Sequence, residues 1–171
     1  SYKYIEIGIG ALNAAKKSAR LQLYGKTVIF IGSCGVFNEE LDVKLVTTQS
    51  LHWSPPSVRS GESQLIENID PEIKLINLST AAQNLPIYQC HCSPSITLNQ
   101  KLSPKKKSIE NLELYSIGEQ LMTAKSITII LGVTNKVHPE GRKEWKSNFP
   151  IVSELTASFI AEQLKDNPQN F

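Results

Sequence analysis

The sequence predicts an α/β domain of three layers, in which helices flank a mostly parallel central sheet. Short apolar runs alternate along the chain with longer segments whose apolar residues recur every three or four positions. The short runs have the length of buried strands, and the longer segments have the period of amphipathic helices. Strands that alternate with helices are typical of a parallel sheet covered on both faces. The 171 residues, 40% of them hydrophobic, suit a single domain over 1–171.

Six segments have the composition of strands, because they are mainly apolar and are bounded by glycine, proline or polar residues. The run at 27–31 is continuous in apolar residues, which indicates a strand buried on both faces. It leads into Gly32-Ser33-Cys34-Gly35, which we interpret as a tight turn. In chain order the expected strands are 2–9, 27–31, 43–49, 73–78, 85–92 and 127–133.

Three segments are predicted to be helices. Helix formers fill 11–24 up to Gly25, and in the other two segments the apolar residues fall on one helical face. The polar stretches 51–68 and 101–108 contain prolines and are expected to be surface loops. In chain order the expected helices are 11–24, 110–123 and 143–164.

Charge and composition argue against several classes of function. With 18 basic and 16 acidic residues the net charge is +2, so the chain lacks the electrostatic footprint of a nucleic-acid-binding protein. Its apolar runs are far shorter than the roughly 20 residues of a membrane span. An odd set of three cysteines fits a reduced, cytoplasmic setting, and Cys90-His91-Cys92 lacks the further ligands of a closed zinc site. We therefore expect no nucleic acid, membrane, metal or cofactor as a partner.

Polar segments that follow predicted strands indicate a ligand site. In open α/β sheets ligands bind at the carboxyl ends of the strands, where 32–35, 90–96 and Thr134-Asn135 are expected. The turn at 32–35 can aim backbone N–H groups and the Ser33 hydroxyl at an oxyanion, a ribose or a water. For this segment taken alone, a tight turn that binds nothing is the alternative.

Four segments resemble a known family. Gly8-Ile9-Gly10 before an Ala-rich helix, and 30–35, resemble successive signatures of the purine nucleoside phosphorylase and methylthioadenosine/S-adenosylhomocysteine nucleosidase superfamily. Residues 111–118 are similar to its Val-Glu-Met-Glu segment, and 131–135 to its Arg-x-Ile-Ser-Asp segment. The match extends over 4–164 with order and spacing retained. The resemblance implies a nucleoside phosphorylase-like fold, a purine nucleoside as the ligand and a homodimer.

One departure from the family pattern favours hydrolysis. Phosphorylases of the family commonly carry an arginine that holds phosphate three residues before the serine of this segment, and Phe30 stands there. An apolar ring cannot supply the charge-assisted bonds that a phosphate dianion needs. Water is then the expected nucleophile, and the expected reaction is hydrolysis of an N-glycosidic bond.

A second departure concerns the purine, because Asn135 stands where adenine-specific members carry an aspartate. Its NH₂ group can donate to a 6-oxo group while its carbonyl accepts from protonated N7, a pairing that suits hypoxanthine. Futalosine hydrolases, the members of menaquinone biosynthesis that release hypoxanthine, are the group that the chain resembles most. Their pattern continues with a basic residue and a tryptophan, as in Arg142 and Trp145. The alternative is an Asn135 that only caps a turn.

The resemblance also implies the other site residues. Glu113 joins Asn135 as a catalytic candidate, although a carboxylate at a helix start is equally favourable for structural reasons. Tyr115 replaces a second family glutamate that grips the ribose hydroxyls. The expected substrate contacts are Gly32, Ser33, Gly35, Cys92, Ile96, Leu114 and Tyr115.

The beginning of the chain departs from the pattern as well. Family members carry strands before the Gly-Ile-Gly segment, with an acidic residue that activates the water, and we expect this domain to lack them. That acid then lies upstream of Ser1 or is absent. The alternatives to a futalosine hydrolase are an adenine-releasing nucleosidase, a phosphorylase of the same fold, and a purine-binding protein without catalysis.

Overall fold

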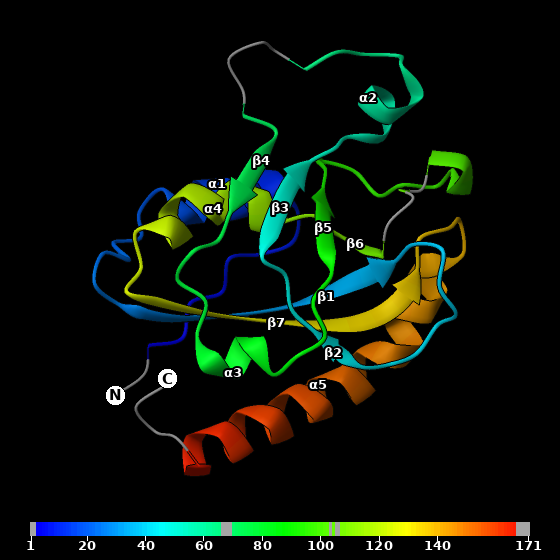
Figure 1. Cartoon of the computed structure of the whole chain (residues 1–171). Coiled ribbons are helices and arrows are strands. Elements are labelled where there is room, and N and C mark those ends of the chain that lie inside the picture. Colours follow the sequence, from blue (N-terminus) through cyan, green and yellow to red (C-terminus); the bar gives the residue numbers. More distant parts are fainter. Residues whose placement is uncertain (1–2, 66–69, 103, 105–106, 167–171) are drawn as a thin grey trace.

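The computed structural model describes residues 3–65, 70–102, 104 and 107–166, which form one mixed sheet with helices on both sides (Figure 1). The strands are β1 (Thr27–Val36), β2 (Leu45–Val46), β3 (Ser50–Trp53), β4 (Glu72–Lys74), β5 (Gln89–Cys92), β6 (Ser108–Asn111) and β7 (Ser126–Lys136). The helices are α1 (Ala11–Ser18), α2 (Pro56–Ser60), α3 (Thr80–Gln83), α4 (Leu114–Met122) and α5 (Gly141–Asp166), with a 3₁₀ turn η1 (Gln100–Leu102).

The sheet has the strand order β2-β7-β1-β6-β5-β3-β4. Its centre is the long parallel pair β1 and β7, aligned from Thr27 opposite Ser126 to Val36 opposite Lys136. The pairs β3·β5 and β5·β6 are also parallel, whereas β1·β6, β2·β7 and β3·β4 are antiparallel. The predicted three-layer α/β class is confirmed, but "mostly parallel" is a loose description because half of these pairings are antiparallel.

Helices α1 and α4 pack together on one side of the central strands, and α5 runs along the other side (Figure 1). The core between these layers is apolar, and β7 is fully buried over most of its length. Glycines allow close packing at two points: a Cβ on Gly132 would meet Val152 of α5, and a Cβ on Gly118 of α4 would meet Ile73 and Leu51. Each fully buried Leu or Ile contributes about 1.5–3 kcal/mol.

The strands predicted at 27–31 and 127–133 and the helix predicted at 143–164 are confirmed, but 27–31 is not buried on both faces as predicted. The strand predicted at 2–9 is wrong over its described part. Residues 3–8 are not in a strand, and Tyr4 is 86% exposed. Gly8 and Gly10 have φ angles of 81° and 87°, a left-handed conformation that β-strands do not use. The helix predicted to follow is confirmed only as far as Ser18.

The turn predicted at 32–35 is also wrong. β1 continues through this segment to Val36, with an irregularity in register between Cys34 and Gly35. β7 likewise continues past Val133 to Lys136. Pairing between the two strands supplies backbone partners along the whole segment, so a turn is not required. Gly32, Ser33, Gly35 and Asn135 therefore lie within strands rather than in loops beyond them.

Two further predictions are wrong in part. The loop expected at 51–68 contains most of β3 and the short helix α2, and the start of the helix expected at 110–123 is the end of β6. All four residues of β6 are buried between β1 and β5, so sheet pairing prevails over local helix preference there. No described helix is both long and apolar enough to cross a membrane.

The edge of β1 that faces β6 is largely unpaired by other described strands. β6 pairs with β1 only at Gly35 and Val36, so no described strand pairs with that side over 27–34. Ile31 in this stretch is 52% exposed, although its neighbour β7 is buried.

Candidate functional site

Ser33 lies in the middle of β1, where two side chains hold it. Trp145 of α5 donates its indole N–H to Ser33 Oγ at 3.0 Å, and Asn111 Nδ2 donates to the Ser33 carbonyl oxygen at 3.0 Å. An indole N–H is only a donor, so Ser33 Oγ must be the acceptor in the first bond. The Ser33 hydroxyl proton is therefore left for another partner.

Asn111, the last residue of β6, connects Ser33 to the beginning of α4. Its Oδ1 accepts from the backbone N–H groups of Glu113 and Leu114, at 2.9 and 2.8 Å. This is the role of a helix cap, because the first N–H groups of a helix have no partner inside it. The same carboxamide thus fixes the position of Ser33 and the orientation of Glu113.

Glu113 lies at the junction of two helix starts. It stands just before α4, and its Oε1 accepts the backbone N–H of Gly10, at the start of α1, at 2.7 Å. Burial raises the pKa of Glu113, and the bond from Gly10 opposes that rise by stabilising the carboxylate. A half-buried hydrogen-bond acceptor is therefore held at a fixed place beside the Asn111 clamp.

Asn135 lies near the end of β7, opposite Gly35, with the start of α5 close by. Its Oδ1 is 2.9 Å from the Thr134 hydroxyl, and its Nδ2 donates to the Lys136 carbonyl oxygen at 2.8 Å. A Cβ on Gly35 would lie 2.8 Å from Asn135 Nδ2, and one on Gly141 would lie 3.0 Å from it. The amide is packed between these glycines, and one N–H and one lone pair remain beyond its local bonds.

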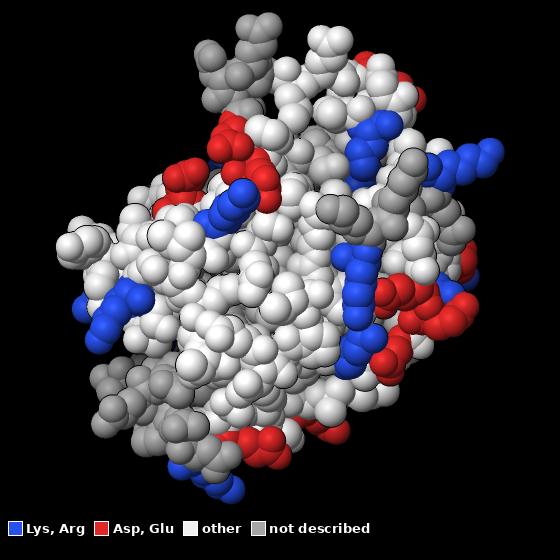
Figure 2. Space-filling model, in the orientation of Figure 1, with Lys and Arg blue, Asp and Glu red and all other residues white. Residues whose placement is uncertain are grey.

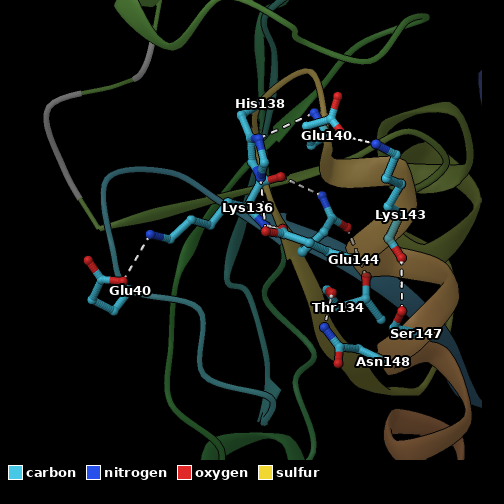
Figure 3. A network of polar contacts seen from close by, with 10 residues as sticks. Glu40, Thr134, Lys136, His138, Glu140, Lys143, Glu144, Ser147 and Asn148 are labelled. Carbon is cyan, nitrogen blue, oxygen red and sulfur yellow. Dashed lines mark hydrogen bonds and ion pairs between the residues drawn. The ribbon is translucent and has the colours of Figure 1, made fainter.

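Polar contacts anchor the end of β7 to the first turns of α5 (Figure 3). Glu144 Oε2 accepts the Lys136 backbone N–H at 2.7 Å, and Glu144 Oε1 is 3.0 Å from His138 Nε2. One turn further along, Asn148 Nδ2 donates to the Thr134 carbonyl oxygen at 2.8 Å. Asn135 and Trp145 are thereby held on a firmly joined strand and helix.

The remaining predicted contacts do not join this group. Cys92 and Leu114 are fully buried in the core, and Ile96 is 54% exposed. The Tyr115 hydroxyl donates to the backbone oxygen of Asp70, and its ring packs against Trp53 with the ring centroids 5.2 Å apart. These four residues stay predicted substrate contacts, but the structure places two of them in the core, one on the surface and one against Asp70 and Trp53.

The thiols of Cys34 and Cys90 are poor nucleophiles. Burial raises the pKa of Cys34, and the hydrogen bond with Cys92 together with burial raises the pKa of Cys90. Within the described part of the chain, no three His, Cys, Asp or Glu side chains are grouped so that they could hold a metal ion.

Gly32 also lies apart from Gly35. A Cβ on Gly32 would meet the ring of Phe30 at 3.0 Å and Leu131 at 3.4 Å, so this glycine packs against the core. The structure therefore brings Asn111 together with the backbones of Ser33 and Glu113, and Gly35 together with Asn135.

Known structures show the same fold. The futalosine hydrolase of Helicobacter pylori matches with a TM-score of 0.70 at 12% identity, over 94% of this chain and 77% of that one. A 5′-methylthioadenosine/S-adenosylhomocysteine nucleosidase from Neisseria meningitidis, in complex with methylthio-immucillin-A, matches with a TM-score of 0.65 at 16% identity, over 93% and 78%. An MTAN from Chlamydia trachomatis gives 0.69 at 16% identity, over 98% and 75%.

This chain has the nucleosidase fold. The expected resemblance is confirmed at that level, and at these identities the likeness establishes the fold alone. No protein-family model and no curated protein matches the chain.

Within the nucleosidase fold, sequence reasoning missed two residues that organise the site. Asn111 was placed inside a predicted helix, although an asparagine just before a helical run is a common cap signal. Trp145 was noted only as part of a resemblance, and nothing in the sequence pairs it with Ser33, which is 112 positions away.

Proposed function

We propose that the protein hydrolyses the N-glycosidic bond of a purine nucleoside. The observation that carries the proposal is the clamp formed by Asn111, whose carboxamide bonds to the backbones of both Ser33 and Glu113. The Ser33 hydroxyl can donate and the Glu113 carboxylate can accept, and a ribose has hydroxyl groups that do both. The nucleosidase fold supports the same conclusion.

Water is the proposed nucleophile. Phe30 is buried in the core, so the position at which family phosphorylases commonly hold phosphate offers no positive charge. Cleavage passes through an oxocarbenium-like ribosyl cation, and the departing purine needs stabilisation as negative charge develops on it. Ser33 and Glu113 position the ribose or the water, and Asn135 serves the base.

The proposed base is a 6-oxopurine, and the proposed substrate is futalosine, which releases hypoxanthine. Asn135 has one N–H and one lone pair beyond its bonds to Thr134 and Lys136, enough for O6 and N7–H. The similar structures include both a futalosine hydrolase and nucleosidases named for adenine nucleosides, so the base has to be measured. A homodimer is part of the proposal, and sedimentation equilibrium tests it.

The deciding experiment measures base release with and without phosphate at fixed ionic strength. We expect hypoxanthine from futalosine, less adenine from methylthioadenosine, and no acceleration by phosphate. A strict phosphate requirement with ribose 1-phosphate as product would contradict hydrolysis. Purine binding without any base release would instead identify a non-catalytic binding protein.

Asn135 variants test how the base is read. Asn135→Ala should lower the rate about 10²–10³-fold, the usual loss when one donor to developing charge is removed. Asn135→Asp should move the preference towards adenine, because a carboxylate removes the donor and adds an acceptor. The measurement is kcat/KM for both bases with each protein. Unchanged preference in Asn135→Asp would show that this residue does not read the purine.

A further inference from the structure

The contact between Trp145 and Ser33 connects α5 to the middle of β1. The indole Nε1 lies 3.0 Å from Ser33 Oγ, and both side chains are half-buried, so the serine can be reached by a ligand. A tryptophan this close to a serine supplies more than apolar area, because its polar tip selects the orientation of the hydroxyl.

The chemistry of the bond fixes the direction of donation. An indole N–H has no acceptor function, so one lone pair of Ser33 Oγ is occupied by Trp145. A serine without this neighbour can turn its proton either way and can serve as a donor or an acceptor. With the indole in place, the O–H points away from Trp145 and serves a ligand as a donor.

Both partners are held in place from behind. The Trp145 ring packs on Phe149, with centroids 5.1 Å apart and an angle of 37° between the ring planes. Asn148 ties the same part of α5 to β7, and Asn111 holds the Ser33 backbone. The geometry of the bond is therefore set by two secondary-structure elements rather than by a mobile side chain.

We propose that Trp145 is a positioning residue that orients the Ser33 hydroxyl so that its O–H donates a hydrogen bond to a ribose oxygen of the bound nucleoside. Glu113 is the acceptor in the proposed function, and its Oε1 already accepts the Gly10 backbone N–H. This inference rests on the proposed function, because it names the part of the ligand that Ser33 recognises.

A double-mutant cycle tests whether Trp145 acts through Ser33. Trp145→Phe keeps an aromatic ring against Phe149 and removes the N–H together with part of the indole, and Ser33→Ala removes the hydroxyl. Each substitution should weaken the binding of inosine, the nucleoside of hypoxanthine and ribose, about three- to tenfold, which is the range for one lost neutral hydrogen bond. The double variant should bind no more weakly than Ser33→Ala alone. Losses that multiply in the double variant would overturn the proposal.

Free hypoxanthine is the matched ligand, because it lacks the ribose. Calorimetry with hypoxanthine should give the same affinity for wild type, Trp145→Phe and Ser33→Ala. An equal loss for hypoxanthine and inosine would show a general disturbance of the site and would overturn the proposed role. Phe149→Leu keeps the indole N–H and removes the ring that supports it, so its inosine affinity should fall less than that of Trp145→Phe and its hypoxanthine affinity should not change.

A second measurement leaves Trp145 intact and so does not depend on how its variant folds. In Trp53→Phe, Trp145 is the remaining tryptophan, and its fluorescence reports on its N–H. Adding Ser33→Ala to this variant should shift the Trp145 emission. Binding of inosine should also shift it, whereas binding of hypoxanthine, which lacks the ribose, should not. Inosine binding without either shift would overturn this inference alone. A wild type that binds neither inosine nor hypoxanthine would overturn both this inference and the proposed function.

Discussion

A single carboxamide at Asn111 joins the two segments on which the proposed chemistry depends. It is 2% exposed, donates to the Ser33 carbonyl and accepts from two N–H groups at the start of α4. A buried polar group that loses its partners costs about 1–3 kcal/mol, so both the fold and the site depend on this side chain.

Two substitutions of Asn111 separate its roles. Asn111→Asp keeps an acceptor for the α4 N–H groups but loses the donor to Ser33, whereas Asn111→Ala loses both. We expect Asn111→Ala to lower the free energy of unfolding by about 2–4 kcal/mol, more than Asn111→Asp. Both should lower inosine affinity. Denaturant titration and calorimetry measure the two effects, and an equally stable Asn111→Ala would contradict the clamp.

His91 makes the stability of the protein depend on pH. Its ring stacks on His52, with centroids 5.5 Å apart, and lies edge-on to Phe37 at 6.0 Å. Burial, followed by the His52 ring and the Arg59 cation, lowers the pKa of His91 from 6.5 to about 4. Between these values the unfolded chain binds more protons than the folded one, so stability falls as the pH falls from about 6.5 towards 4.

His91→Gln isolates this effect. From pH 7 to pH 4 we expect wild type to lose about 1–3 kcal/mol more unfolding free energy than His91→Gln, after discounting for the part of the ring that is exposed. Urea titrations at several pH values measure the difference between the two proteins, in which other titrating groups cancel. Parallel profiles would show that His91 has an ordinary pKa.

At the scale of elements, the contact between β7 and α5 is set by Gly132. A Cβ at this position would lie 1.8 Å from Val152 Cγ1, closer than any real contact, so strand and helix approach only because the side chain is absent. Asn135 lies on β7 and Trp145 on α5, so the distance between these two elements also sets the geometry of the site. Gly132 therefore affects the site although it lies outside it.

Gly132→Ala should lower the unfolding free energy by about 1–3 kcal/mol through overpacking. Val152→Ala made alone leaves a cavity. Combined with Gly132→Ala, it should restore part of the unfolding free energy that Gly132→Ala removes. We expect a favourable coupling of at least about 1 kcal/mol, measured by denaturant titration of the four proteins of the cycle. Additive losses would mean that α5 moves away from the sheet freely.

At the scale of the whole molecule, charge and cooperativity are the relevant properties. Acidic and basic side chains are interspersed on the face shown in Figure 2, in keeping with a net charge of +2. Both ends of the sheet share one buried cluster, which includes Val46 of β2 and Ile73 of β4. A continuous core of this kind favours a single cooperative domain.

Single-tryptophan proteins test that domain organisation. Trp53 reports on β3 and Trp145 on α5, so Trp53→Phe and Trp145→Phe each leave one probe. In each variant we expect the fluorescence midpoint to coincide with the far-UV circular dichroism midpoint of the same protein. A fluorescence transition that departs from the dichroism transition in either variant would reveal two separately unfolding parts.

The sequence alone determined the features that depend on local pattern. Continuous apolar runs identified the cores of β1 and β7, although only β7 is buried on both faces over most of its length. The period of apolar residues identified α5 and most of α4. The proposed roles of Phe30 and Asn135 could also be predicted from their positions in the family pattern, because each role depends on one side chain.

Tertiary structure decided the features that depend on distant segments. β6 is a strand because it lies between β1 and β5, and 32–35 is extended because β7 runs beside it. The Tyr115 side chain contacts Asp70 and Trp53, and the hydrogen-bond partners of Ser33 lie on α5 and β6. Local propensity differs between conformations by tenths of a kcal/mol per residue, whereas burial and pairing contribute whole kcal/mol. Where the two disagreed, the contacts between segments far apart in the chain prevailed.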